Sequence, residues 1–428
     1  VNPDSGGDSH SQPGKSSAPP SETVVLDTAD VTAWLDGFMP YALERGQIAG
    51  GAVVVVHNGQ PIVEKGYGYA DFATKKPVDG KTTMFRPGSI SKLFTWTAVM
   101  QQVEAGKLDL DKDVNAYLDF KIPPYDGKPI TLRNIMTHSA GFEESIRHLI
   151  SNDPKAVMEL GKYSREALPE RVFAPGTTPA YSNYATALAG HIVERVSGMS
   201  FDDYVDQRIF APLGMAHSTF RQPLPAKFKP FMSSGYKSLA APAQPFEIVI
   251  PAPAGSLSAS SADMGKFMMA HLADGGKLLS PETARMMHNY QAPNIGPLNS
   301  MALGFYEQWI NGRRAISHGG DTGLFHSDLW LFPKENIGLY ITMNSGGKEG
   351  ASHAVRTALI QKFANRYLPD NRQFTPIDEA TARKHAEIMA GTYVMSRGSF
   401  TNFMSLFGLL STTKVLVGPD GKLMIPSK

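Results

Sequence analysis

A β-hairpin signal near the start of the chain constrains the fold more than any other feature. Residues 50–71, GGAVVVVHNGQPIVEKGYGYAD, contain two runs of strand-forming residues joined by Asn58-Gly59. An Asn-Gly pair between such runs is the strongest short-range signal of a hairpin, because both residues tolerate positive φ. Two strands alone are not stable, so the hairpin needs strand partners elsewhere in the chain.

The sequence places these partners late in the chain, behind a helical middle. Short apolar runs at 302–310, 313–320, 327–333 and 337–344 are separated by turn residues. Most of 86–290 instead shows the apolar spacing of helices. We therefore predict an α+β (α/β sandwich) fold: an antiparallel sheet of N- and C-terminal strands, flanking helices, and a large, mostly helical insertion. An active site is expected in the crevice between sheet and insertion.

The chain is predicted to have three parts. Residues 1–23 are rich in Ser, Pro and Gly, which is typical of a disordered leader. Residues 24–370 would form the main domain, with the helical subdomain at about 86–290. Residues 371–428 would form a linker helix and the start of a small C-terminal β module. Because its two or three strands are too few for stability, we expect this module to be truncated at Lys428.

Composition and charge exclude several classes of function. The 428 residues carry 41 Lys and Arg against 40 Asp and Glu, without the basic bias of a nucleic-acid-binding protein. The absence of cysteine excludes disulfides, thiolate metal sites and a cysteine nucleophile. The histidines form no HExxH motif, so we expect neither metal nor cofactor. No apolar run approaches the roughly 18 residues of a membrane helix.

The leader also bears on localisation. A disordered leader often follows a removed signal peptide, so export to the bacterial periplasm or the medium is expected. A cloning remnant is the alternative origin of this segment.

The stretch RPGSISKLF, residues 86–94, places Ser89 three residues before Lys92 at the start of a predicted helix. Positions i and i+3 share one helix face, so both side chains can point into one cleft. A desolvated, neutral lysine can take the proton of a serine nucleophile. The plain alternative is that Ser89 caps the helix and Lys92 is a solvated surface charge.

Two further motifs support the catalytic interpretation. Tyr181-Ser182-Asn183 opens a helical pattern after a Pro- and Gly-rich loop, and Ser317-His318-Gly319-Gly320-Asp321 ends a strand-like run. Ser-x-x-Lys, Tyr-x-Asn and a Lys/His/Trp-x-Gly strand motif, in this order, resemble the β-lactamase and penicillin-binding-protein superfamily of serine hydrolases. The similarity covers about residues 30–368. It is greatest to class C β-lactamases, the D-alanyl-D-alanine carboxypeptidases of that branch, D-aminopeptidases and family VIII esterases.

The resemblance implies a role for each motif residue. Ser89 would be the acylated nucleophile, Lys92 and Tyr181 would act as general base and acid, and Asn183 would bind Lys92 and a substrate carbonyl. The remaining implied substrate-binding positions are His318, Gly319, Gly320 and Asp321. The glycines would let substrate lie against the strand, and the backbone N–H groups of Ser89 and Asp321 would form the oxyanion hole.

The histidine at position 318 differs from the residue found in the penicillin-directed members. In this respect the sequence resembles the esterases and aminopeptidases of the superfamily. The penicillin-directed members carry a lysine at this position, whereas histidine is largely neutral near pH 7. We therefore expect a small ester, amide or peptide substrate and weak or no β-lactamase activity. The alternatives are a non-catalytic or stalled penicillin-sensor-like domain, and a true class C-like β-lactamase or DD-peptidase. Specificity is expected to depend on loops 143–172 and 221–254, and His138 is interpreted as structural.

Overall fold

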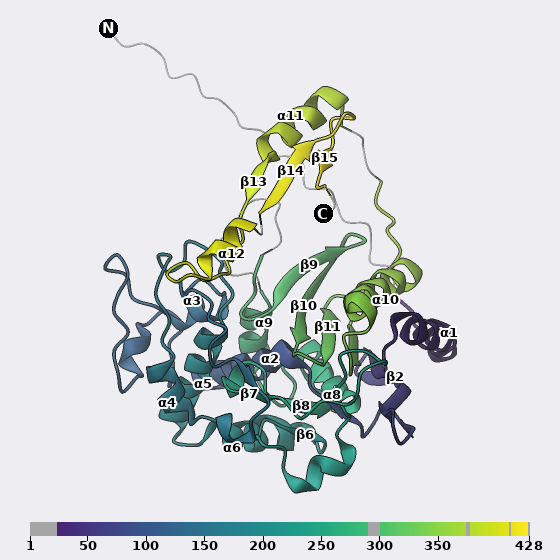
Figure 1. The fold of residues 1–428 in the computed structure, drawn as a ribbon, viewed down its shortest axis with the longest axis horizontal. Coiled ribbons are helices and arrows are strands. Elements are labelled where there is room, and N and C mark those ends of the chain that lie inside the picture. Colours follow the sequence, from purple (N-terminus) through teal and green to yellow (C-terminus); the bar gives the residue numbers. More distant parts are fainter. Residues whose placement is uncertain (1–23, 290–299, 374–376, 411, 427–428) are drawn as a thin grey trace.

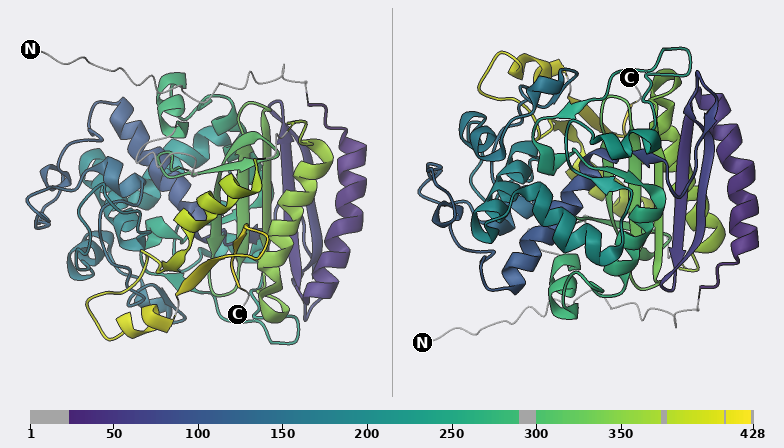
Figure 2. Two further views of the ribbon diagram at one scale, coloured as in Figure 1. Left: turned by 90° about the horizontal axis from the view of Figure 1, so that it is seen from above. Right: turned by 90° about the horizontal axis from the view of Figure 1, so that it is seen from below.

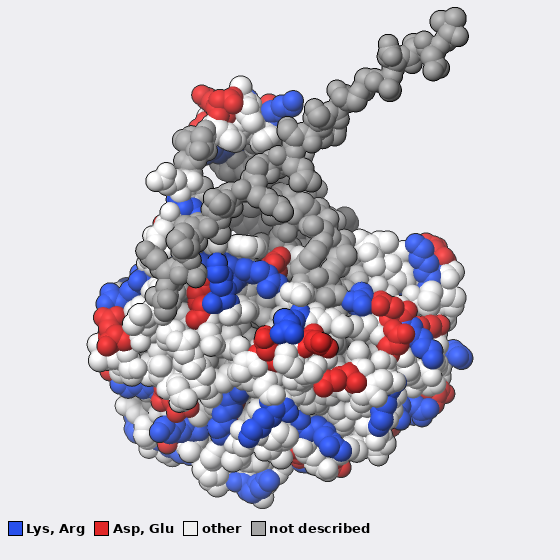
Figure 3. Space-filling model, turned by 180° about the vertical axis from the view of Figure 1, so that it is seen from behind, with Lys and Arg blue, Asp and Glu red and all other residues white. Residues whose placement is uncertain are grey.

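The structure of the chain is a computed structural model that describes residues 24–289, 300–373, 377–410 and 412–426. The predicted leader, 1–23, lies outside these ranges. Within them, no helix combines the length and the apolar character needed to cross a bilayer. Figure 3 shows positive and negative side chains interspersed over one face of the molecule, in keeping with the near-balanced charge.

A seven-stranded antiparallel sheet forms the centre of the molecule. In spatial order it contains β3 (Lys76–Pro77), β2 (Gln60–Asp71), β1 (Gly50–His57), β12 (Ile337–Met343), β11 (His326–Phe332), β10 (Arg313–Asp321) and β9 (Tyr306–Ile310). The N-terminal hairpin joins the late strands through β1 and β12, with Gly51 opposite Met343 and His57 opposite Ile337. The predicted fold class, with its sheet of N- and C-terminal strands, is confirmed.

Strand β1 is buried on both faces, which explains its unbroken apolar run. Val53 and Val55 pack with side chains of α1 (Thr28–Gly46) and α10 (Ala351–Tyr367) on one face. Val54 and Val56 point to the other face, where they join the core of the helical region. Figure 2 shows α1 and α10 on one side of the sheet and the helical region on the other. Successive side chains of β1 point to opposite faces of the sheet, so this strand contributes to two separate cores.

The helical region connects β3 to β9 and lies against the sheet (Figure 1). Its helices are α2 (Ser91–Glu104), α3 (Leu132–Met136), α4 (Leu160–Glu166), α5 (Asn183–Ser197), α6 (Phe201–Val205), α7 (Ala211–Leu213), α8 (Ser261–Leu272) and α9 (Pro281–His288). Its short strands form two small sheets: β4 (Met84–Phe85), β8 (Ser258–Ser260) and β6 (Ser218–Thr219); and β5 (Ile150–Ser151) with β7 (Ile248–Val249).

Short 3₁₀ and π-helical segments complete the connections of the main domain. The 3₁₀ turns are η1 (Gly88–Ile90), η2 (Val114–Ala116), η3 (Pro154–Ala156), η5 (Ala226–Phe231), η6 (Ala252–Ala254) and η7 (Lys348–Gly350), and η4 (Asp206–Phe210) is π-helical. Two of them, η1 and η6, position the candidate site described below.

The C-terminal region follows α10 and returns to the helical region. It comprises α11 (Glu379–Met389), α12 (Ser405–Leu410) and a three-stranded antiparallel sheet of β13 (Gly391–Tyr393), β14 (Thr413–Val417) and β15 (Leu423–Met424). Figure 1 shows α11 and the sheet above the rest of the molecule, while the β13–β14 connection descends to it. At its lower end the Glu144 amide donates to the Gly398 carbonyl (2.9 Å). The sequence predicted strands in this region, but it did not predict that the β13–β14 connection contacts the helical region.

Buried neutral histidines predict that the fold is sensitive to acid. His271 on α8 and His288 on α9 are buried against each other, Nδ1 to Nε2 2.9 Å. Burial lowers the pKa of His288 to about 4. Below pH 6.5 the unfolded chain therefore binds more protons, and this site contributes a loss of about 2 kcal/mol of unfolding free energy between pH 7 and 4.5.

Urea denaturation at several pH values measures this loss. We expect His288→Gln to flatten the acid side of the stability profile. The exposed His385 on α11 supplies the control, and His385→Gln should leave the profile unchanged. Equal slopes in the wild type and His288→Gln would contradict the assignment.

Candidate active site

Ser89 lies in the 3₁₀ turn η1, directly before α2, and not within the helix itself. Neither η1 nor α2 has a side-chain hydrogen bond at its N-cap, so Ser89 does not act as the cap. Its side chain instead lines a cavity of about 950 Å³ between the helical region and the sheet. The alternative that Ser89 is an ordinary capping residue is therefore wrong.

Lys92, in the first turn of α2, is fully buried next to Ser89. Its Nζ lies 3.0 Å from Ser89 Oγ, 2.8 Å from Asn183 Oδ1 and 2.7 Å from the Ala254 carbonyl oxygen. Burial lowers the pKa of Lys92 well below its ordinary value, although the negative charge of Glu144 opposes the shift. The alternative of a solvated surface lysine is also wrong.

The hydrogen-bond acceptors around Lys92 define what its neutral amine can do. A neutral amine has two N–H bonds and one lone pair. The oxygens of Asn183 and Ala254 can only accept, so they take the two N–H groups. The lone pair is left for the hydroxyl hydrogen of Ser89, whose oxygen is the third neighbour.

The start of α5 positions the second motif. Ser182 is the N-cap, and its side chain accepts a hydrogen bond from the Ala185 amide. This cap fixes Asn183 as the first helical residue, facing Lys92, and leaves Tyr181 in the preceding extended segment. The helix ends at Gly198, whose left-handed conformation forms the C-cap.

Tyr181 is half-buried beside Lys92, and its hydroxyl oxygen is buried. Lys92 Nζ lies 4.8 Å from the centre of its ring, and the ring of His138 packs 4.3 Å away on another side. Burial raises the pKa of the Tyr181 phenol, and the nearby Ser89 hydroxyl only partly offsets this. The Tyr181 hydroxyl forms no hydrogen bond of normal length with the described residues. A neutral phenol that can donate a proton is favoured.

His318 lies near the end of β10 and is neutral. Burial, the largest cause, lowers its pKa to about 3. Its Nδ1 lies 2.6 Å from the Gly319 carbonyl oxygen, which requires the proton on Nδ1. Its Nε2 is then an acceptor, and it has no partner among the described residues. The imidazole therefore presents no positive charge to the cavity.

Two glycines let the turn before α2 approach the end of β10. Gly88 has φ +56°, and a Cβ atom there would lie 2.6 Å from the Asp321 amide nitrogen. A Cβ atom on Gly320 would lie 1.8 Å from the Pro87 oxygen and 2.9 Å from the Ser89 amide nitrogen. Gly320 was predicted to admit substrate, but it faces η1, whereas Gly319 lines the cavity. The amides of Ser89 and Asp321 thus belong to closely apposed segments.

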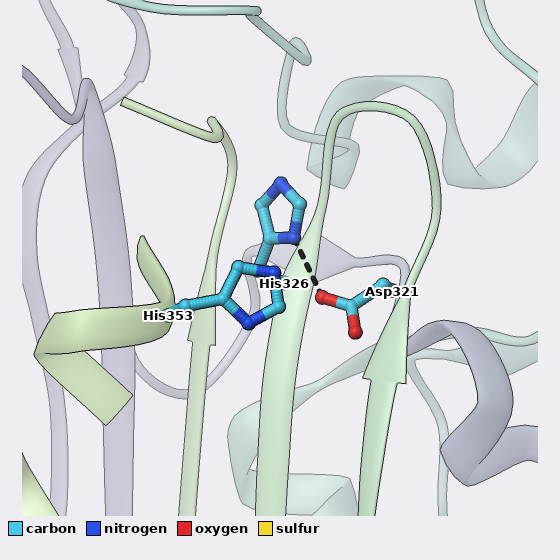
Figure 4. Close-up of side chains that lie close together, drawn as sticks. All are labelled: Asp321, His326 and His353. Carbon is cyan, nitrogen blue, oxygen red and sulfur yellow. Dashed lines mark hydrogen bonds and ion pairs between the residues drawn. The ribbon is translucent and has the colours of Figure 1, made fainter. Parts of the chain in front are cut away.

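The Asp321 side chain anchors this end of β10. Its carboxylate accepts a hydrogen bond from His326 Nδ1 (2.7 Å) and pairs with Arg356 (3.1 Å). Figure 4 shows His326 and His353 near this carboxylate, and the three side chains lie close enough together to suggest a metal site. However, Arg356 also contacts His353 Nδ1 (2.7 Å). A guanidinium already supplies the cation, so the cluster is better explained as an ion-pair network.

Two charged residues at the site were not predicted from the sequence. Glu144 Oε2 lies 3.4 Å from Asn183 Nδ2 and 3.0 Å from Nη2 of Arg397, and Arg397 lines the cavity. Glu144 lies at the start of the predicted specificity loop 143–172, so its position was a usable signal. Nothing in the sequence around Arg397 indicated a site. The predicted specificity loops meet through β5 and β7, and Ile150 and Val249 line the cavity.

Known proteins are similar to this chain over about three quarters of its length. The family model described as Beta-lactamase matches residues 35–362. The putative penicillin-binding protein PbpX of Bacillus subtilis (strain 168) is 30% identical over 340 residues, which cover 77% of this chain and 75% of PbpX. Protein flp of Staphylococcus aureus (strain N315) is 26% identical over 327 residues, covering 74% of this chain. The aligned part is 64% of flp, so the chain spans less than two thirds of that relative.

Solved structures share the fold at lower sequence identity. The octameric penicillin-binding protein homologue from Pyrococcus abyssi has a TM-score of 0.66 at 22% identity, covering 90% of this chain and 86% of its own. The β-lactamase/D-alanine carboxypeptidase from Pseudomonas syringae has a TM-score of 0.65 at 20% identity, covering 80% and 100%.

The close approach of η1 and β10 predicts that Gly320→Ala disables Ser89. The added Cβ must push β10 away from the Ser89 amide. Displacing one donor of an oxyanion site slows reaction about a hundredfold or more. The rate of labelling by a serine-directed fluorophosphonate measures this effect, with circular dichroism as a check of folding. A methyl group added at Gly37 on α1 would meet nothing within 4 Å beyond its own stretch of helix, so Gly37→Ala is the control. Labelling of Gly320→Ala at the wild-type rate would refute the role of this contact.

Proposed function

The chain belongs to the beta-lactamase family, whose members are serine hydrolases, and from that premise we propose that it cleaves ester or amide bonds of small substrates through an acyl-Ser89 intermediate. The observation that carries this proposal is the environment of the Lys92 amine. Its two N–H groups have their own acceptors, so its lone pair is available to the Ser89 hydroxyl. A capping serine and a solvated lysine would have no use for such an arrangement.

In the first step, Lys92 takes the proton as Ser89 Oγ attacks the substrate carbonyl carbon. The carbonyl π electrons move onto oxygen and form a tetrahedral oxyanion. The amides of Ser89 and Asp321, brought together by Gly88 and Gly320, are the proposed donors to that oxygen. Preorganised backbone donors of this kind stabilise the developing charge without reorganising.

In the second step, the tetrahedral intermediate expels the alcohol or amine. The neutral Tyr181 phenol donates the proton to the leaving group and recovers one from Lys92, beside which it lies. This gives Tyr181 the acid part of the shared role inferred from the sequence, because a raised pKa disfavours its phenolate. Water then attacks the acyl-Ser89 ester and releases the acid product.

The neutral His318 supports the preference for esters or peptides over β-lactams. A fixed cation at this strand position would attract a substrate carboxylate, whereas His318 offers only an imidazole nitrogen as acceptor. At the His318 position itself, a neutral hydrogen-bond donor of the substrate is therefore favoured over a carboxylate. A non-catalytic or stalled penicillin sensor, and a true β-lactamase or DD-peptidase, are distinguished from this proposal by the following experiments.

A substrate panel tests the proposed activity directly. Short-chain p-nitrophenyl esters, D- and L-amino-acid amides, linear peptides and cephalosporins are assayed with the wild type and Ser89→Ala. We expect turnover of esters or amides that falls by at least about a thousandfold in Ser89→Ala, because the acyl intermediate cannot form. Stoichiometric labelling without turnover would instead identify a stalled sensor. Turnover that survives in Ser89→Ala would overturn the proposal.

Replacing His318 tests the proposed substrate preference. His318→Lys restores a cation, and a charge-assisted hydrogen bond contributes roughly 1.5 kcal/mol, so nitrocefin kcat/KM should rise about tenfold relative to a neutral ester. His318→Gln keeps the position neutral and should give no such gain. Wild-type nitrocefin turnover that rivals ester turnover would reverse the preference.

A further inference from the structure

One wall of the catalytic cavity comes from the C-terminal region. Residues Val394, Met395, Ser396 and Arg397, which follow β13, line the same cavity as Ser89. The family match ends at residue 362. This wall therefore lies outside the part of the chain on which the family assignment rests.

The wall is fastened to the helical region by backbone and side-chain hydrogen bonds. The Glu143 carboxylate accepts from the amides of Phe400 (2.7 Å) and Thr401 (3.0 Å), and from the Thr401 hydroxyl (2.7 Å). The Glu144 amide donates to the Gly398 carbonyl oxygen (2.9 Å). These bonds place residues 394–401 in a defined position, so Arg397 is held at the cavity and does not merely pass near it.

Arg397 lies against the catalytic residues. The centre of its guanidinium is 4.5 Å from the centre of the Tyr181 ring. Its Nη2 and Nε both contact the same oxygen of Glu144, at 3.0 and 3.1 Å. The Arg397 side chain is 43% exposed and that of Glu144 only 10%. A guanidinium has five N–H groups, so one carboxylate oxygen leaves donors on the cavity side for a second anion.

The positive charges of the cavity single out Arg397. Two acidic residues also line the cavity, but Glu307 pairs with Arg314, and Asp321 pairs with Arg356. Among the described residues that line the cavity, Arg397 is the only lysine or arginine. His318 is neutral, and Lys92 is buried behind Ser89 with its N–H groups occupied. A fixed positive charge is therefore present at the site, but on the C-terminal wall and not on β10.

We propose that Arg397 binds a carboxylate of the substrate, so that the C-terminal wall makes the enzyme selective for anionic esters or amides. This inference rests on the proposed hydrolase function. Glu144 is the internal counter-ion, and it competes with the substrate carboxylate for the same guanidinium. Arginine pairs with carboxylates bidentately, and its planar geometry would orient the substrate as well as attract it.

Matched ester pairs test the proposal. p-Nitrophenyl hemisuccinate differs from p-nitrophenyl butyrate by a carboxylate in place of a methyl group on the acyl side. 3-Acetoxybenzoate differs from phenyl acetate by a carboxylate on the leaving-group side. The measured quantity is the ratio of kcat/KM for the anionic member to that for the neutral member of each pair.

Arg397→Gln is expected to lower this ratio at least tenfold for one of the pairs, mainly through KM. Arg397→Lys should retain part of the ratio, because it keeps the charge but not the planar fork. Glu144→Gln should raise the ratio, since it keeps the side-chain shape and removes the competing charge. Lys384→Gln removes one positive charge from the exposed face of α11 and is the control, with no change expected.

The opposite effects of Arg397→Gln and Glu144→Gln distinguish binding from structure. If the ion pair only held the wall in place, both variants would lower neutral and anionic turnover alike, and the ratio would stay constant. That result, or an unchanged ratio in Arg397→Gln for both pairs, would overturn the proposal.

Results that contradict the proposed hydrolase function differ from those that contradict the role of Arg397. Turnover that persists in Ser89→Ala, or no turnover of any ester or amide, would contradict that function alone. In either case, calorimetric binding of both ester pairs to Ser89→Ala, with and without Arg397→Gln, decides on Arg397. Preference for the anionic member of one pair that is lost with Arg397 supports the proposal, and equal binding of the two members in both pairs refutes it.

Discussion

The buried amine of Lys92 is the group around which the rest of the site is arranged. An amine in an apolar interior loses its proton readily, and a neutral amine needs acceptors for its N–H groups. One acceptor comes from Asn183 at the start of α5 and the other from the Ala254 carbonyl in η6. These elements are far apart in sequence, so the helical region must fold correctly before Lys92 can direct its lone pair at Ser89.

The sheet contributes to the same site through backbone contact. Side chains normally hold helices and strands several ångströms apart, but Gly88 and Gly320 remove that spacing between η1 and β10. The backbone of Ser89 therefore lies against the end of β10. Contacts of Asp321 with His326 and Arg356 anchor this end. The nucleophile therefore lies at the contact between η1 and β10, and both segments must be in place for it to work.

Much of this arrangement could be predicted from the sequence. The hairpin signal at Asn58-Gly59 and the late apolar runs predicted the sheet, because strand periodicity is a local property. The spacing of Ser89 and Lys92 predicted that their side chains lie together, and Lys92 Nζ is 3.0 Å from Ser89 Oγ. Lys92 is buried behind Ser89, however, and does not line the cavity with it. The pairing of Glu144 with Arg397 could not be predicted, because it joins residues 253 positions apart through an irregular connection. The 3₁₀ turn at Ser89 was also missed, since it depends on the contact with β10.

The wall formed by residues 394–397 and the reacting groups that it faces come from different parts of the chain. Ser89, Lys92, Tyr181 and His318 all belong to the main domain, whereas this wall belongs to a connection between two short strands. Mutations, insertions or deletions in that connection can remodel the cavity without disturbing the nucleophile or its base. Substrate range and chemical competence can thus diverge independently during evolution, as they do in antibodies, whose loops vary on a constant framework.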